Sequence, residues 1–131
     1  MKIEINQAPL IRKFMETMRL MNVYLNHFPK HERYGLCSRI RSTAYAVYDL
    51  IVEGMKRYHK KTTLTALDIA HEQLRMQVFL AHELGYFGFT KGAEDGADPA
   101  AKRYMAISRH IDELGKMIGA WISRAQEAGA W

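Results

Sequence analysis

The chain has 131 residues, 48% hydrophobic and 25% charged, with a formal net charge of +5. This composition predicts one globular domain, residues 1–131, that is large enough to bury a core. The chain has no apolar run of roughly 18 residues, no basic-then-apolar N-terminus and only one cysteine, Cys37. We therefore expect a cytoplasmic protein with no membrane span, no secretory signal and no internal disulfide.

Four segments carry apolar residues every three or four positions, which is the spacing of amphipathic helices. The first predicted helix, residues 9–27, begins at Pro9, because proline is tolerated at the first helical position. The second predicted helix, residues 32–60, ends in the cationic run 56–61. Positive charge at that end complements the helix dipole.

The third predicted helix, residues 64–84, follows the threonine-rich stretch 62–65, whose side-chain oxygens we expect to cap it. Gly85 is expected to close this helix. Residues 85–98 contain four glycines and no helical period, so they are predicted to form a loop. The fourth predicted helix spans residues 99–127. Since no strand-like alternation appears, the chain is predicted to be an all-α, antiparallel up-and-down four-helix bundle.

Two glycines, Gly115 and Gly119, lie inside the fourth predicted helix. A mid-helix glycine costs about 1 kcal/mol relative to alanine, so its presence needs a reason. We expect both glycines to allow close approach of a neighbouring helix, with Trp121 filling the space beyond them.

The second and third helices carry apolar residues beyond their core stripes, which suggests burial against another subunit. The alternative is a wide core face with scattered exposed apolar residues. The residues assigned to a homo-oligomer interface are Tyr45, Tyr48 and Val52 in the second helix and Ile69, Met76, Phe79 and Leu80 in the third.

The sequence contains no pattern typical of a catalytic or metal site. His71-Glu72 lacks the second histidine, four positions after the first, that a helical zinc-protease motif needs. Asp68 and His71 give one spacing similar to that of a di-iron site, with no support elsewhere. We expect surface or capping roles for these two residues and an inert buried thiol at Cys37. The prediction is therefore no enzyme, no metal and no cofactor.

Positive charge gathers at the two ends of the second helix, since residues 30–61 hold eight Lys/Arg against three Asp/Glu. Cationic side chains on a rigid helix can contact phosphates without reading bases. Tyr34 and Tyr58 lie beside the clusters and suit base stacking, although we expect Tyr34 to pack against the end of the bundle. The alternative is a basic surface without a ligand. The predicted nucleic-acid-binding residues are Lys30, Arg33, Arg39 and Arg41 at one end, and Lys56, Arg57, Lys60 and Lys61 at the other.

Residues 28–36, Phe-Pro-Lys-His-Glu-Arg-Tyr-Gly-Leu, with Arg39-Ile40-Arg41, resemble the signature of a four-helix-bundle superfamily. It contains the accessory variability determinant (Avd) proteins of diversity-generating retroelements and the proteins encoded in intervening sequences of bacterial large-subunit rRNA genes. Residues 111–122 resemble the Avd closing helix, with its Gly-x-x-x-Gly-x-Trp-Ile pattern. Residues 42–54 lack the proline that is usual in the rRNA group, and this difference favours the Avd group.

The resemblance implies a homopentameric, barrel-like ring of four-helix bundles that binds reverse transcriptase and RNA or DNA. Such a protein supports adenine-mutagenic complementary-DNA synthesis during retrohoming and performs no chemistry itself. Arg75 matches an arginine of the family's third helix, and the resemblance therefore implies that Arg75 contacts the polymerase. The alternative is an ion pair between Arg75 and Glu72. The competing hypothesis is an rRNA intervening-sequence-type interaction module without a nucleic-acid role.

Overall fold

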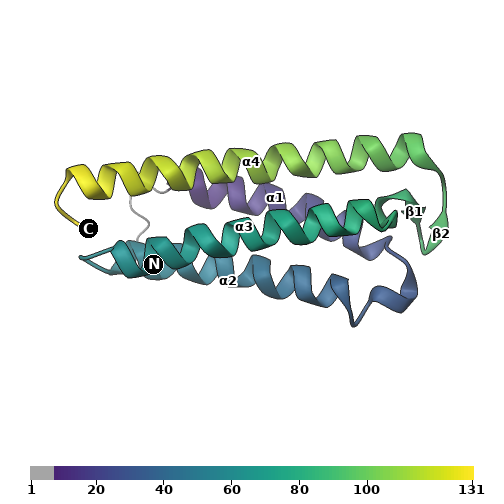
Figure 1. Ribbon diagram of the computed structural model, residues 1–131, viewed down its shortest axis with the longest axis horizontal. Coiled ribbons are helices and arrows are strands. Elements are labelled where there is room, and N and C mark those ends of the chain that lie inside the picture. Colours follow the sequence, from purple (N-terminus) through teal and green to yellow (C-terminus); the bar gives the residue numbers. More distant parts are fainter. Residues whose placement is uncertain (1–7) are drawn as a thin grey trace.

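The computed structural model describes residues 8–131, and these form four long helices and a short hairpin. The helices form an elongated bundle in which α2 packs along α3, while α4 packs along α1 and α3 (Figure 1). Consecutive helices run in opposite directions, so the predicted all-α, up-and-down four-helix bundle is confirmed for the described residues. Residues 1–7 of the predicted domain lie outside them. The helices are α1 (Ala8–Asn26), α2 (Leu36–Lys56), α3 (Lys61–Glu83) and α4 (Ala97–Glu127).

Helix α2 is shorter at both ends than the predicted helix 32–60. A short 3-10 helix, η2 (Lys30–Glu32), and a turn precede it, and the Glu32 carboxylate accepts a hydrogen bond from the Leu36 N–H at 3.3 Å. At the other end the backbone becomes extended at Arg57 (φ −82°, ψ 138°). The predicted bounds were wrong because cationic residues continue past both ends of the helix without a capping signal.

Helix α3 begins at Lys61, before the threonines that were expected to cap it, and no side chain caps its first turn. Thr63 is instead buried, and its hydroxyl donates a hydrogen bond to Glu53 Oε2 of α2 at 2.8 Å. The threonine-cap prediction was therefore wrong, since this threonine ties α3 to α2. Gly85 follows the helix in the left-handed conformation (φ 80°), as predicted.

The connection between α3 and α4 is more ordered than a loop. It contains a second 3-10 helix, η3 (Tyr86–Gly88), and an antiparallel pair of strands, β1 (Phe89–Thr90) and β2 (Ala93–Glu94). Two positive φ angles at the turn, 53° at Lys91 and 77° at Gly92, suit a tight hairpin. This hairpin was not predicted from the sequence, because two-residue strands are too short to show alternation.

The core consists of two clusters, one in each half of the bundle. In one half a Cβ on Gly54 of α2 would lie 2.7 Å from Trp121 Cη2, so this glycine allows the indole to pack between the helices. In the middle of α4 a Cβ on Gly115 would lie 2.6 Å from His71 Cε1. The packing role predicted for Gly115 is thus confirmed. The same prediction for Gly119 was wrong within residues 8–131, because apart from the neighbouring backbone of α4 no atom of these residues lies within 4 Å of its Cβ position.

Candidate nucleic-acid interface

The eight predicted nucleic-acid-binding cations form two separate groups on the bundle. We call Lys30, Arg33, Arg39 and Arg41 the start cluster, because they surround the first residues of α2. We call Lys56, Arg57, Lys60 and Lys61 the end cluster. Helix α2 has 21 residues, so about 30 Å separate its two ends. The two clusters therefore cannot form one compact site within a single chain.

Two of the four cations of the end cluster already have partners within the chain. The Lys60 ammonium donates hydrogen bonds to the carbonyl oxygens of Gly54 (2.6 Å) and Arg57. It thereby satisfies acceptors at the negative end of α2. Arg57 Nη2 lies 3.6 Å from Glu53 Oε1, which compensates its charge. Lys56 and Lys61 stay exposed, so only half of this cluster is free to meet another anion.

The start cluster keeps its charge. Arg41 donates hydrogen bonds to two neutral amides of α1, from Nε to Asn22 Oδ1 at 3.2 Å and from Nη2 to Asn26 Oδ1 at 2.7 Å. These contacts orient the guanidinium and leave its charge uncompensated. Lys30, Arg33 and Arg39 are exposed, and no carboxylate of the described residues lies within 4 Å of their charged groups.

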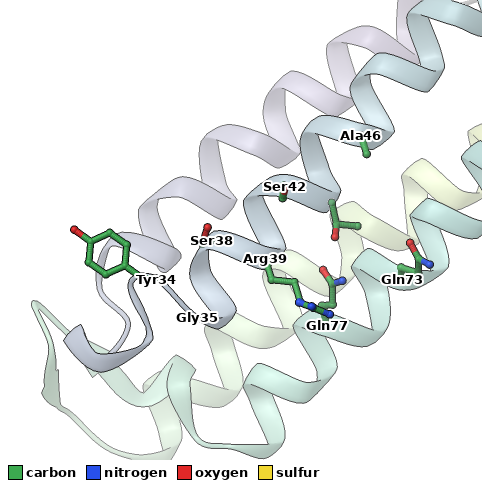
Figure 2. Close-up of a pocket in the computed structure, with 9 residues that line it drawn as sticks. Tyr34, Gly35, Ser38, Arg39, Ser42, Ala46, Gln73 and Gln77 are labelled. Atoms are coloured by element: carbon green, nitrogen blue, oxygen red, sulfur yellow. The ribbon is translucent and has the colours of Figure 1, made fainter.

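A groove of about 710 Å³ runs between α2 and α3 beside the start cluster. Figure 2 shows Arg39 in this groove, with Ser38 and Ser42 of α2 on one side and Gln73 and Gln77 of α3 on the other. The serines were not among the predicted site residues. Ser38 and Ser42 flank Arg39 and Arg41 in the sequence and are four residues apart on the helix, and this spacing is the signal that could have identified them.

Both aromatic residues beside the clusters are exposed, Tyr34 by 86% and Tyr58 by 74%. The prediction that Tyr34 packs against the end of the bundle was therefore wrong. The guanidinium carbon of Arg33 lies 5.5 Å from the centroid of the Tyr34 ring, which is a cation–π contact. The ring of Tyr58 instead meets that of His59 edge to face, with the centroids 4.8 Å apart.

Arg75, the candidate polymerase contact, is paired within the chain. Its Nε donates a hydrogen bond to Glu72 Oε2 at 3.2 Å, and its Nη2 contacts Glu72 Oε1. The hydrogen bond from Arg75 lowers the pKa of Glu72. The ion pair anticipated as the alternative is thus present, on a surface where both side chains are about half exposed.

The residues assigned to an oligomer interface divide into two groups. On α3, Ile69 (55% exposed), Met76 (48%), Phe79 (40%) and Leu80 (47%) all face outward. On α2, Tyr45 is exposed, whereas Tyr48 and Val52 pack partly against the chain's own core, with the Tyr48 and Phe14 rings 5.3 Å apart. Leu84, the residue directly after the end of α3, is also 52% exposed. The uncovered apolar surface thus lies mainly on α3.

His71 is buried, and its Nε2–H donates a hydrogen bond to the Ile111 carbonyl at 2.7 Å. The surface or capping role expected for His71 was wrong. Cys37 is buried as expected, and burial raises the pKa of its thiol. Among residues 8–131 no group of three or more His, Cys, Asp or Glu is arranged to hold a metal ion. None of the described helices is long and apolar enough to cross a membrane.

Comparison with known proteins agrees with the resemblance of residues 28–36 and 111–122 to the Avd group. No curated protein and no solved structure matches the chain. A family model described as bAvd-like matches residues 9–125, which include all four helices apart from their outermost residues and both basic clusters. The chain therefore belongs to the bAvd-like family.

Proposed function

We propose that this protein is a non-catalytic accessory subunit of a diversity-generating retroelement, which binds the reverse transcriptase of the element and its RNA or complementary DNA. The observation that carries the proposal is the start cluster, four cations with no carboxylate of residues 8–131 within 4 Å of their charged groups, in a chain of the bAvd-like family. Cations of this kind attract phosphates with little regard to base sequence.

The proposed active form is a homo-oligomer, a ring of five bundles, in the cytoplasm. The outward apolar residues of α3 support self-association, because bulky apolar side chains in one stripe favour burial against a second surface. Five copies of a chain with net charge +5 would carry about +25. Such a charge would attract a polyanion strongly from solution.

The reverse transcriptase is the proposed protein partner, and Arg75 is the proposed contact. Its pair with Glu72 is exposed, and exposed pairs contribute little to stability. Arg75 can therefore exchange Glu72 for a carboxylate of a partner at small cost. The accessory protein would position the polymerase on its template and need no cofactor or metal of its own.

The experiment that tests this function compares two variants with the same change in charge. Lys30→Glu/Arg33→Glu/Arg39→Glu reverses the start cluster, and Lys56→Glu/Arg57→Glu/Lys61→Glu reverses the end cluster. Binding of single-stranded RNA and duplex DNA is measured by fluorescence anisotropy at about 50 mM and about 200 mM salt.

We expect the wild type to bind at low salt and to lose affinity steeply as salt rises. Reversal of the start cluster should lower the affinity at least about tenfold and flatten the salt dependence. Reversal of the end cluster should do less, because one of its three changed residues, Arg57, already has its charge compensated by Glu53. Equal losses would mean that only overall charge matters. No binding by the wild type at low salt would refute the nucleic-acid role and favour an interaction module.

A further inference from the structure

Three concave surfaces meet around Tyr34, which is the one residue that lines all of them. The first is the groove between α2 and α3 described above (Figure 2). The second, of about 730 Å³, lies between the end of α1 and the start of α2. The third, of about 350 Å³, lies on the outer face of α2 between the other two. Together they form one concave track around the start of α2.

The cavity between α1 and α2 has an apolar interior and a cationic mouth. Leu25, Phe28 and Cys37, all buried in the core, contribute to its lining. Arg33 and Arg41 line it as well and bring positive charge. An apolar cavity with a few placed polar groups is the usual form of a site for a flat organic group. Positive charge beside it suits a group that carries a phosphate.

Tyr34 supplies an open aromatic face at the junction of the three surfaces. With the residue 86% exposed, the ring contributes little to the packing of the bundle. The Arg33 guanidinium near the ring adds a second planar group on which a base can stack. Tyr58, although nearly as exposed, lines none of these three surfaces.

The cations are placed on both sides of this ring. Arg39 lines the groove toward α3, and Arg41 lines the cavity toward α1. Hydrogen bonds from Arg41 to Asn22 and Asn26 hold its guanidinium in place before any ligand arrives. A chain that crosses the start of α2 would therefore meet a positive charge before and after Tyr34.

We propose that this track binds a single-stranded nucleic acid, with one unpaired base stacked on Tyr34 at the mouth of the cavity between α1 and α2. Arg39 and Arg41 hold the phosphates on either side of that base. A duplex is a poorer ligand, because its bases are stacked on one another and cannot present a face to the ring. This inference rests on the proposed function and adds to it the form of the nucleic acid and the residue that selects it.

The test uses two single strands that carry the same charge and differ only in their bases, together with a duplex. They are a fluorescent RNA strand of about 12 nucleotides, an abasic strand of equal length, and a duplex of that length. Binding is measured for the wild type, Tyr34→Ala and Tyr34→Phe, with Tyr58→Ala as the control for loss of an exposed tyrosine. Circular dichroism checks that each variant is folded.

We expect Tyr34→Ala to weaken binding of the RNA strand about tenfold without a change in its salt dependence, because no phosphate contact is lost. Tyr34→Phe and Tyr58→Ala should stay within about twofold of the wild type, and the abasic strand should bind the wild type about tenfold more weakly. Affinity for the duplex should not depend on Tyr34.

Two results would refute this inference and leave the proposed function standing. One is equal affinity of the wild type and Tyr34→Ala for the RNA strand, and the other is equal affinity of the wild type for the RNA and abasic strands. Competition by poly-glutamate as effective as that by RNA of equal charge would indicate an acidic protein ligand instead and refute it too. Failure of the wild type to bind any nucleic-acid probe would overturn both proposals.

Discussion

Replacement of Gly115 by alanine tests the closest helix contact in the middle of the bundle. The new Cβ would lie 2.6 Å from His71 Cε1 and 3.1 Å from His71 Nε2, both well inside van der Waals contact. The imidazole cannot move freely, because it is buried and its Nε2–H is bonded to the Ile111 carbonyl at 2.7 Å. The substitution therefore forces either overpacking or the loss of a buried hydrogen bond.

Either outcome costs about 1–3 kcal/mol, and the gain in helix propensity on replacing glycine by alanine returns about 1 kcal/mol. We expect a net loss of up to about 2 kcal/mol. A chain of this size loses about 3–4 °C of melting temperature per kcal/mol, so Tm should fall by up to about 8 °C.

Gly119→Ala is the matched control, one turn further along the same helix. Apart from the neighbouring backbone of α4, no atom of the described residues lies within 4 Å of its Cβ position. Only the propensity gain of about 1 kcal/mol therefore remains, and Tm should rise by about 3 °C. Thermal melts are compared at one protein concentration, because the Tm of an oligomer depends on concentration. Shifts of the same sign in both variants would refute the packing argument.

Two further predictions concern the hairpin and the surface of α3. Hydrogen bonds from Arg103 lower the pKa of Asp95 from 3.8 to about 2, so its ionised form stabilises the folded state above pH 3.8 and that contribution disappears as the pH falls toward 2. Asp95→Asn should therefore destabilise the protein in urea unfolding at pH 7, with the difference from the wild type shrinking between pH 4 and pH 2; a constant difference would contradict this. Met76→Glu should shift the mass measured by light scattering toward the 15.2 kDa monomer, because a charge buried between subunits is costly. The helix content should change little, because this residue is 48% exposed in the single chain. A wild type that is already monomeric at micromolar concentration would refute the oligomer itself.

The helices and their core faces could be predicted from the sequence because apolar spacing is a local signal. Ile40, Val47 and Ile51 of α2 are fully buried, as their spacings of seven and four residues indicate. The ends of the helices could not be predicted in the same way. They depend on contacts such as the bond from Thr63 to Glu53, which joins two helices and has no local pattern.

The candidate site was predictable in part. The sequence shows which residues are cationic, but charge compensation depends on the tertiary structure. Lys60 turns back onto the carbonyl of Gly54, while Arg41 meets only neutral amides on another helix. The exposure of Tyr34 likewise depends on the turn that joins η2 to α2, which the predicted continuous helix did not include.

The proposed function requires this chain to enable a reverse transcriptase to copy its template RNA. The most direct measurement is complementary-DNA synthesis by the reverse transcriptase of the proposed retroelement, on the template RNA of that element, with and without the purified protein. We expect full-length product, with errors concentrated at template adenines, only when the wild-type protein is present, and much less product with the start-cluster variant. Equal product without the protein, or the same yield with the start-cluster variant, would contradict it.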